Sequence, residues 1–383
     1  MRKVCPNIFL ACIFLLSAAC KNHNNYTVIK NVRLFDGENY FERVNLVFNS
    51  DSIVSISKNE NLPEANTIID GTGQTIIPPL LNAHVHVWSE KNLKEAMSAG
   101  IYALLDMHTT DSVANELRKY KDYIDCATYY SSGPGATVKG GHGTQFGISV
   151  PVIDSMVTPY KFVKERVDNG ADYIKILREP VMENTINFEQ TKEVIDVAHS
   201  FKKPCVAHIS YLEDALVLNS QGIDGFVHIW FVKKSNSSEI QQFVKSKIFI
   251  VPTLHVIQKA LQIGKRESWS KDFLTFDEVR GEVRKAYQSG IPILVGTDAP
   301  NFNFDFGPEY FNEVELLAQC GLSNIDILKS ATSNVYKSFK LNAYGRIEKH
   351  APATFILVDG DPIKSIRDLR KPKKLFRKGK LIN

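Results

Sequence analysis

Residues 76–86 of the 383-residue chain read IIPPLLNAHVH, and this stretch decides how the rest of the sequence is interpreted. A run of apolar residues leads into two histidines, His84 and His86, which are separated by a single valine. Side chains of a β-strand alternate between its two faces, so both imidazoles point to the same side. Two imidazoles one pleat apart can reach one metal ion. The stretch therefore predicts a buried strand that ends in part of a metal site.

Beyond this stretch, short apolar runs alternate with segments of helical periodicity. The predicted strands are Ile101–Asp106, Tyr173–Leu177, Cys205–Ile209, Gly225–Ile229, Ile248–Val251 and Ile293–Gly296. The predicted helices are Val113–Tyr123, Pro159–Asn169, Glu189–Phe201, Glu213–Ser220, Ser237–Lys245, Asp277–Ser289 and Tyr310–Cys320. Strands that alternate with helices indicate a parallel sheet, and this many units predict an α/β fold with a TIM (β/α)8 barrel. Such a barrel needs roughly 250 residues, so the chain is long enough.

Polar side chains stand at the ends of several of these strands. Lys175, His208, His228 and Asp298 each lie within or directly after an apolar run. Each residue alone has a structural explanation, since a lysine usually reaches solvent and a strand histidine is usually a core residue. Together with the first two histidines, however, they would be costly to bury without a partner. Imidazole and carboxylate ligands suit zinc and similar ions, so the set predicts a pair of divalent metals.

Strand signals also occupy both ends of the chain. They are Val28–Leu34, Val44–Phe48, Ile53–Ile56, Thr67–Ile69, Thr354–Val358 and a last strand near Leu375. We expect the two ends to form one small β-sandwich. The predicted divisions are a leader at 1–20, sandwich parts at 26–78 and 343–383, and the barrel at 79–342.

The first twenty residues have the features of an export signal. Arg2 and Lys3 precede an apolar core, Ile8–Leu16, which is short for a transmembrane helix. Small residues then lead to Cys20, as in the lipobox of bacterial lipoproteins, although Ser17 stands where leucine is usual. The sequence predicts an exported protein, in the periplasm or at the cell surface, that is tethered to a membrane by lipid at Cys20. The alternative is an ordinary secretory leader that is cut near the same point.

Composition excludes some classes of partner and framework. The formal net charge is only +4, which gives no argument for a nucleic-acid partner. The basic residues between Lys364 and Lys380 are interpreted as a solvated edge, with contact to an anionic membrane as the alternative. Outside the leader and Cys20, three widely spaced cysteines remain, Cys126, Cys205 and Cys320, and they indicate no disulfide framework.

The order of these motifs resembles the amidohydrolase superfamily, in its imidazolonepropionase-like and prolidase-like branch. The segment that ends in His84 and His86 resembles the first-strand motif of the family, with Asn82 where aspartate is common. Residues 173–176 resemble the segment whose lysine is carboxylated. Residues 250–254 and 296–299 resemble the seventh and eighth strands, and the passage from Ala331 to Pro362 resembles the return into the sandwich.

The resemblance implies roles for these residues. His84, His86 and Asp298 would hold one divalent ion, and His208 and His228 would hold a second. Lys175, N6-carboxylated, would bridge the two ions, which are expected to be zinc, with manganese, iron or cobalt as alternatives. A metal-activated hydroxide would attack a carbonyl group, while Asp298 transfers its proton to the departing nitrogen.

Two further residues bear on the substrate, which is expected to be a small molecule. His142 lies in the run Gly140–Gly143, and Tyr211 follows His208 by three positions. By analogy with peptidase-like members, they would bind a substrate carboxylate. The alternative is that the glycines only form a tight loop and that the tyrosine packs on the following helix. Mononuclear deaminases of the superfamily have glutamate at the position of Tyr211, which argues against deamination.

Three functions are consistent with the sequence. The first is hydrolysis of an amide-type carbon–nitrogen bond in a dipeptide or N-acyl amino acid. The second is hydrolysis of a cyclic amide or lactone, as in imidazolonepropionase-like enzymes. The third is a non-catalytic exported binding lipoprotein, which predicts missing ligands. Whether the chain forms a homo-oligomer is left open by the sequence.

Overall fold

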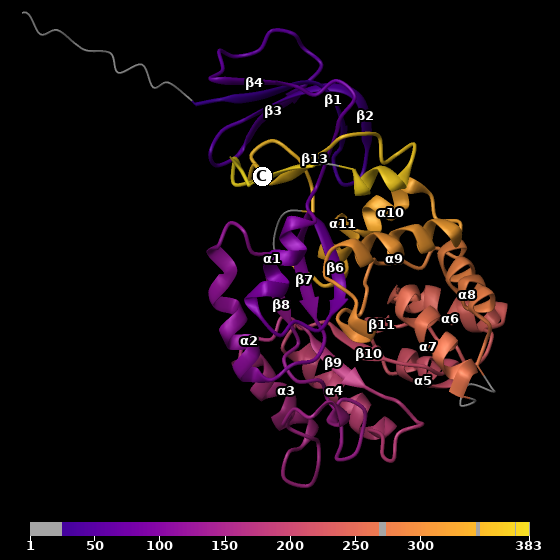
Figure 1. Cartoon of the computed structure of the whole chain (residues 1–383). Helices are drawn as coiled ribbons and strands as arrows, with labels where there is room; N and C mark the ends of the chain where they lie inside the picture. The colour runs from indigo at the N-terminus through magenta and orange to yellow at the C-terminus, as the bar shows by residue number, and fades with distance from the viewer. Residues whose placement is uncertain (1–24, 268–272, 342–344, 372, 383) are drawn as a thin grey trace, which may run out of the picture.

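The computed structural model describes residues 25–267, 273–341, 345–371 and 373–382. Figure 1 shows two parts: strands from both ends of the chain lie at the top, and the helices and parallel strands of the central segment lie below them. The predicted leader and Cys20 lie outside the described residues. Within the described part of the chain, no helix is both long and apolar enough to cross a membrane.

The central segment is built from two parallel sheets. One has the strand order β6-β7-β8 and the other β12-β11-β10-β9, and all of their pairs are parallel. The strands are β6 (Leu80–Val85), β7 (Ile101–Asp106), β8 (Thr128–Ser131), β9 (Ile174–Leu177), β10 (Cys205–His208), β11 (Gly225–Val227) and β12 (Phe249–Val251). They alternate with helices along the chain, so the predicted α/β class agrees with the structure.

Backbone hydrogen bonds connect these two sheets at both of their edges. Leu177 N donates to Ala136 O over 2.9 Å, which joins β9 to the segment after β8. The run Ile293–Gly296, predicted as a strand, forms no regular strand and contributes one isolated bridge at Ile293. It nevertheless bonds on both sides, because Leu294 N donates to Ile250 O and Val295 O accepts from Ala83 N.

The helices mostly follow their predicted positions. They are α1 (Glu90–Ser98), α2 (Asp111–Leu117), α3 (Pro159–Asp168), α4 (Phe188–Ser200), α5 (Leu212–Ser220), α6 (Ser237–Ser246), α7 (Leu254–Glu267), α8 (Phe276–Gln288), α9 (Pro308–Gln319), α10 (Asn324–Ser330) and α11 (Ser333–Ser338). Three short 3-10 helices, η1 (Arg118–Asp122), η2 (Thr144–Phe146) and η3 (Asn301–Asn303), lie between them, and η4 (Ile366–Arg370) follows near the C-terminus.

Two differences from the predicted helices matter for the site. The prediction of one helix through Tyr123 was wrong, because the chain tightens into η1 after Leu117. Helix α7 was not predicted, since its first turn follows directly from the β12 segment without a polar break. Its first two backbone amides, at Leu254 and His255, donate to the buried carboxylate of Glu313 on α9. This carboxylate satisfies amides that a helix start otherwise leaves without a partner.

Both ends of the chain contribute to a third sheet. Its order is β15-β14-β13-β5-β1-β2-β3, with β4 paired to β1. The strands are β1 (Thr27–Phe35), β2 (Tyr40–Phe48), β3 (Ile53–Ser57), β4 (Thr67–Asp70), β5 (Thr75–Ile77), β13 (Phe355–Val358), β14 (Lys373–Arg377) and β15 (Lys380–Leu381). Aromatic rings from the two ends meet, since the Phe48 and Phe355 rings lie 5.2 Å apart. The strands from both ends are hydrogen-bonded into one sheet. The division of this region into sandwich parts at 26–78 and 343–383 stays a prediction.

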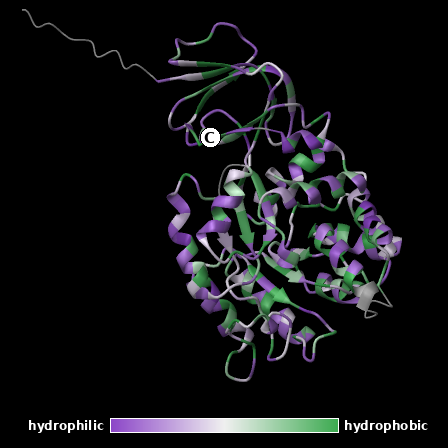
Figure 2. Cartoon of the chain, viewed as in Figure 1, coloured by the Kyte–Doolittle hydropathy of each residue, from purple (hydrophilic) through white to green (hydrophobic). Residues whose placement is uncertain are grey.

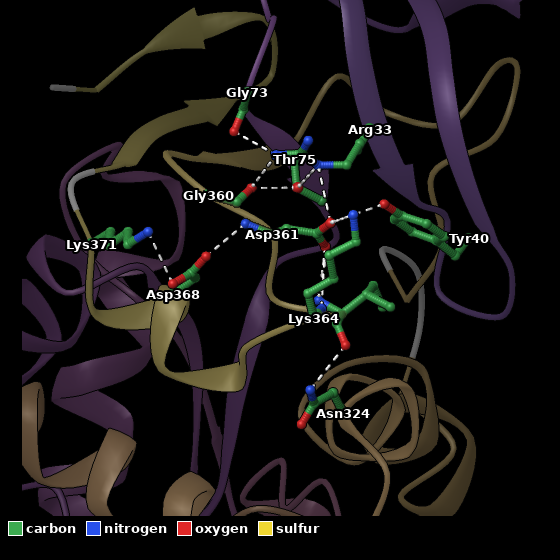
Figure 3. A network of polar contacts seen from close by, with 11 residues as sticks. Arg33, Tyr40, Gly73, Thr75, Asn324, Gly360, Asp361, Lys364, Asp368 and Lys371 are labelled. Atoms are coloured by element: carbon green, nitrogen blue, oxygen red, sulfur yellow. Dashed lines mark hydrogen bonds and ion pairs between the residues drawn. The ribbon is translucent and has the colours of Figure 1, made fainter.

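A polar network ties this sheet to the central segment (Figure 3). The Arg33 guanidinium lies 3.5 Å from the Asp361 carboxylate and also donates to the carbonyl of Gly360. Tyr40 OH donates to the same carboxylate over 3.3 Å. On the other side, Asn324 at the start of α10 donates to the carbonyl of Ile363. These contacts fix the turn after β13 against both parts of the molecule.

The interior of both parts is apolar. Figure 2 shows hydrophobic residues gathered on the strands, with hydrophilic residues on the outer faces of the helices. Cys126, Cys205 and Cys320 are buried and unbridged, as expected for small core residues. Against this background, buried polar side chains at the carboxyl ends of the parallel strands require a separate explanation.

Candidate metal centre

One cavity of about 90 Å³ brings together all six residues that the sequence proposes as metal ligands. They come from the ends of β6, β10 and β11, from the interior of β9 and from the segment after Ile293. His142 lines the same cavity. The lining residues from the predicted set are His84, His86, Lys175, His208, His228, Asp298 and His142. The convergence on which the predicted chemistry depends is therefore present.

The tightest group consists of His84, His86 and Asp298. The Nε2 atoms of the two histidines lie 3.2 and 3.0 Å from the same carboxylate oxygen, Asp298 Oδ1. One candidate ligand atom from each residue lies within 4.8 Å of the others. Asn301 Nδ2 donates to the other oxygen, Asp298 Oδ2, over 2.9 Å. That bond orients the carboxylate so that Oδ1 faces the two histidines.

Close packing explains how Asp298 reaches this position. The segment that carries it passes between β12 and β6, and Gly296 is its point of closest approach. A Cβ atom at Gly296 would collide with the Val251 side chain and would lie 3.0 Å from His84 N. Only glycine fits there, so a larger residue would push the Asp298 backbone away from the histidines.

Hydrogen bonds determine which ring nitrogen of three histidines faces the cavity. His86 Nδ1 lies 3.1 Å from the carbonyl of His108, so it carries the hydrogen and leaves Nε2 as a lone-pair donor. His208 Nε2 lies 3.3 Å from Glu179 Oε2, so Nδ1 of His208 is the ring nitrogen that remains for the cavity. His228 Nδ1 contacts Thr253 Oγ1, whose own hydrogen goes to the Pro252 carbonyl. His228 Nε2 is therefore a lone-pair donor as well.

His208 and His228 form a second group next to the first. Their ring centroids are 4.8 Å apart, and the His228 ring lies 4.9 Å from the His84 ring. Lys175 lines the same cavity from β9, where it is paired in register with Val206 of β10. The lysine is fully buried among these imidazoles. Lys175 therefore belongs to the same buried cluster as the two groups of ligands.

Burial controls the protonation of the cluster. It lowers the pKa of His84 and of His208 to about 3, and it lowers the pKa of His228 as well. Burial also lowers the pKa of Lys175 to about 7, with Asp298 opposing the shift. Burial alone would also lower the pKa of His86, but the hydrogen bond and charge of Asp298 raise it. Burial alone would raise the pKa of Asp298, but the charge of His84 and the hydrogen bonds of His84 and His86 hold it well below its usual range.

These observations show that the residues fit divalent metal ions. Neutral imidazoles and an ionised carboxylate are the forms that bind a cation. His84 Nδ1 is buried and has no hydrogen-bond partner in the described part of the chain, so the protein alone does not satisfy this cluster. Cations in the cavity would compensate the lone pairs that converge there.

The two residues predicted to bind substrate lie in different places. The His142 ring stacks on the His208 ring at a centroid distance of 4.2 Å, and Gln145 Nε2 lies 3.2 Å from its Nδ1. Tyr211 is not among the residues that line the 90 Å³ cavity. It lines a neighbouring cavity of about 310 Å³, which shares His208, His228, Asp298 and Asn301 with the first.

Sequence reasoning missed several residues of the site. His108, two positions after Asp106, lines the metal cavity, and its Nδ1 accepts from Gly135 N over 2.9 Å. Glu179 and Thr253 contact the outer nitrogens of His208 and His228. For His108 and Glu179 the sequence signal was the alternation of side chains along a strand. His108 lies two positions after Asp106 and Glu179 lies four positions after Lys175, so each is expected on the same face as that residue. Nothing in the sequence pattern singled out Thr253 or Asn301.

Comparisons with known proteins agree with this arrangement. Residues 75–382 match the amidohydrolase family. A stretch of 91 residues is 35% identical to adenine deaminase 2 of Shouchella clausii (strain KSM-K16), and the match covers 23% of this chain but only 15% of that protein. Since the chain matches so little of that relative, the relative does not define its activity.

Solved structures resemble the chain over nearly its whole length. A Xaa-Pro dipeptidase with bound methionine has a TM-score of 0.79 at 21% identity, covering 94% of this chain and 100% of that one. The ochratoxinase of A. niger has a TM-score of 0.78 at 18% identity, and the match covers 94% of this chain and 96% of that one. A putative prolidase from Bifidobacterium longum has a TM-score of 0.75 at 21% identity, and the match covers 94% of this chain and 95% of that one. At these identities the likeness shows a shared α/β fold.

The family match is the finding that identifies the chain. It begins at β5, includes every strand that carries a candidate ligand, and ends in β15. The predicted resemblance to amidohydrolases is confirmed by this match, whereas the role of each single residue stays a prediction. The chain therefore belongs to the amidohydrolase family, the group of metal-dependent hydrolases that its sequence resembles.

Proposed function

We propose that this amidohydrolase cleaves carbon–nitrogen bonds of the amide type at a centre of two divalent metal ions. The observation that carries the proposal is the meeting of six predicted ligands in one cavity of about 90 Å³. The family match supports the reaction class. The substrate is a small molecule, because the reacting groups lie in a cavity of this size and not on an open face.

We further propose that the two parallel sheets form one closed (β/α)8 barrel. The hydrogen bonds at Ala136, at Ile250 and at Val295 support closure, since they connect each sheet edge to the next. In such barrels the reacting groups gather at the carboxyl ends of the strands. That is where β6, β9, β10 and β11 carry the candidate ligands.

The ligand assignment follows the two groups of side chains. His84, His86 and Asp298 would hold one ion, and His208 and His228 the other, with zinc as the expected metal. Lys175 would join the two groups after its neutral amine combines with carbon dioxide to form a carbamate, which offers two anionic oxygens where an amine offers one lone pair. When bound, the ions would supply an activated water nucleophile and polarise the substrate carbonyl.

The residues of the chain supply orientation and proton transfer. Asp298 Oδ1 faces the histidine Nε2 atoms, while Asn301 holds Oδ2. In this position Asp298 can accept a proton from the nucleophile and deliver it to the departing nitrogen, which must leave as a neutral amine. Glu179 and Thr253 hold the rings of His208 and His228 in the orientation that ligation requires.

The favoured substrate is a dipeptide or an N-acyl amino acid with a free carboxylate. His142 and Tyr211 would bind that carboxylate from the two sides of His208. Structures of similar fold include a Xaa-Pro dipeptidase and a putative prolidase, both named for action on peptides. Hydrolysis of a cyclic amide or lactone is the alternative, and a binding protein without catalysis is the third candidate.

The test is a set of initial rates on purified full-length protein loaded with zinc or manganese. We expect turnover of dipeptides or N-acetyl amino acids and a loss of turnover after chelation. Turnover of lactones or cyclic amides alone would replace the favoured substrate with the alternative. No turnover of any of these, combined with retained binding of a small molecule, would favour the binding protein.

Export and lipid attachment at Cys20 are a separate proposal. It is supported by the charged, apolar and small-residue order of residues 1–20. Expression in a bacterial host with labelled fatty acid tests it. Label that is incorporated into the wild-type chain but not into Cys20→Ala supports a lipoprotein, and cleavage without label supports the ordinary secretory leader.

A further inference from the structure

The larger cavity beside the metal centre contains Tyr211, but most of its wall has no role in the chemistry proposed above. Its volume is about 310 Å³, and it opens on His208, His228 and Asp298, which it shares with the smaller cavity. A group bound there would thus be part of a molecule that also reaches the metal centre. The cavity is therefore a subsite of the same active site and not a separate pocket.

Most of its wall is apolar. Helix α7 contributes Val256, Ile257 and Ala260, and aromatic rings from other segments complete the lining. Two of these rings, Phe231 and Phe273, pack edge to face with centroids 5.1 Å apart. Burial of an aromatic or branched aliphatic group against such a wall is favourable in proportion to the apolar area removed from water.

The loop after Asp298 adds one aromatic ring to this wall. Phe302 lines the cavity and is 43% exposed, whereas Phe304 and Phe306 are only 5% and 1% exposed. Of the three phenylalanines in the loop, two therefore pack in the core and one faces the substrate space. A ligand in the cavity would cover the Phe302 ring and remove its apolar surface from water, which is favourable.

The polar residues of the cavity define what it excludes. Glu179 lines it and accepts a hydrogen bond from Ser210, and no lysine or arginine is among its described lining residues. An acidic side chain of the substrate in this space would meet the carboxyl group of Glu179 and no basic side chain, which is unfavourable. Apart from the carboxylate proposed to bind Tyr211, the wall thus favours apolar groups.

Tyr211 links this subsite to a particular part of the substrate. It lines the large cavity together with the α7 residues. Since Tyr211 is proposed to bind the substrate carboxylate, the amino acid that carries the carboxylate would direct its own side chain into the apolar space. We propose that the enzyme prefers substrates whose carboxyl-terminal, departing amino acid has an aromatic or large aliphatic side chain. This inference rests on the proposed function and adds the substrate class.

The test compares N-acetyl-L-phenylalanine with N-acetylglycine and N-acetyl-L-aspartate on the metal-loaded full chain. We expect kcat/KM to be about 30-fold higher for the phenylalanine substrate than for the glycine substrate, as burial of one phenyl group predicts. The aspartate substrate should be the poorest of the three. Calorimetric titration with free L-phenylalanine and glycine measures the same preference as binding, without any turnover.

A variant of α7 makes the test specific to the cavity. Ala260 lines the cavity and is only half-buried, so Ala260→Phe can fill the subsite without overpacking the core. We expect it to reduce the phenylalanine-to-glycine ratio to below about 3-fold while the glycine substrate is still hydrolysed. Gln262→Phe adds the same ring at an exposed position of the same helix and should leave the ratio unchanged.

The outcomes separate this inference from the proposed function. Hydrolysis with a ratio near one, or with a ratio that Ala260→Phe does not change, overturns the subsite and leaves the hydrolase standing. No hydrolysis, but tighter binding of L-phenylalanine than of glycine that Ala260→Phe abolishes, supports the subsite and overturns the hydrolase. Neither hydrolysis nor binding overturns both.

Discussion

The molecule contains two dense clusters of polar side chains, and they differ in whether the chain satisfies them. In the network of Figure 3, Arg33 faces Asp361 and Lys371 lies 3.0 Å from Asp368. The second cluster, at the mouth of the parallel strands, gathers imidazoles and a lysine around one carboxylate, Asp298. In the first cluster, charges of opposite sign meet, and in the second, lone pairs meet.

This difference separates a structural cluster from a functional one. A network whose partners all belong to the chain can only stabilise the fold, by a modest net amount for each hydrogen bond. A buried cluster that leaves a ring nitrogen without a partner among the described residues, as His84 Nδ1 is, is complete only with a ligand from outside. Changes in the two clusters should thus affect different properties, namely stability in one and metal binding with activity in the other.

The largest expected effect is that of Asp298→Asn. The variant keeps the shape of the side chain but removes the charge and the proton acceptor, so kcat should fall on the order of 10³-fold. Initial rates and metal content of the folded variant check this. Asp361→Asn is the matched change in the structural network, and it should leave kcat and metal content unchanged. Equal losses of activity in both variants would contradict the distinction between a functional and a structural cluster.

Lys175→Ala should have the next largest effect. Loss of the bridging carbamate should reduce kcat about 100-fold and lower metal content, because support of a metal ligand set is worth at least 10- to 100-fold. Propionate should restore part of the activity, since its carboxylate supplies the missing anionic oxygens. Lys373→Ala is the control: this lysine is half-buried, with a pKa lowered by burial to about 8, but it lies on β14. Activity that survives Lys175→Ala in full would speak against a bridging lysine.

Asp361→Asn should reduce stability and not activity. Its carboxylate faces Arg33 and Tyr40, and burial with the nearby charge raises the pKa of Tyr40 to about 12. Loss of one partner of a buried hydrogen-bonded pair costs about 1–3 kcal/mol, which denaturant unfolding can measure. An unchanged free energy of unfolding would mean that this network contributes nothing to the fold.

The last prediction concerns two buried glutamates and the pH dependence of stability. Burial raises the pKa of Glu313 from 4.5 to about 8. Between these two values the unfolded chain has lost a proton that the folded chain keeps, so stability falls as pH rises, by up to about 1.4 kcal/mol per pH unit. Glu313→Gln should flatten the free energy of unfolding measured between pH 5 and pH 8, where the window lies.

Glu282 is the control for that measurement, because it is buried but paired. Burial alone would raise its pKa, but bonds from Lys285, Ser235 and Trp230 hold the pKa below its usual value. Its contribution to stability is therefore present above pH 4.5 and lost only as pH falls through its lowered pKa. Glu282→Gln should destabilise the protein without changing the slope between pH 5 and pH 8. If the free energy of unfolding depends on pH equally in both variants and in the wild type, the assignment of this pH dependence to Glu313 is contradicted.

The same contrast explains how much of the site could be predicted from the sequence. Strand alternation for Lys175 and the strand-end position of His208 and His228 were sufficient, since parallel strands bring their carboxyl ends together. The metal ligands depend on this regular geometry, and the regular geometry is visible in the pattern of apolar residues. The α/β class was predictable for the same reason.

The residues that support the ligands were less predictable. The contact of Thr253 with His228 depends on where the chain turns after β12, and the separate cavity of Tyr211 depends on how α7 packs against α9. The segment Ile293–Gly296 has the composition of a strand. It lies between β12 and β6, yet it forms one isolated β-bridge instead of a regular strand. Tertiary packing determines these features, and apolar periodicity carries no information on them.

Elemental analysis of the purified full-length chain tests the central claim most directly. The account predicts about two divalent ions per folded chain in the wild type and in Asp361→Asn, because both keep every proposed ligand. It predicts a clear loss of bound metal in Asp298→Asn and in Lys175→Ala. A wild-type chain that is active without bound metal, or one whose metal content is the same in all four proteins, would contradict the account.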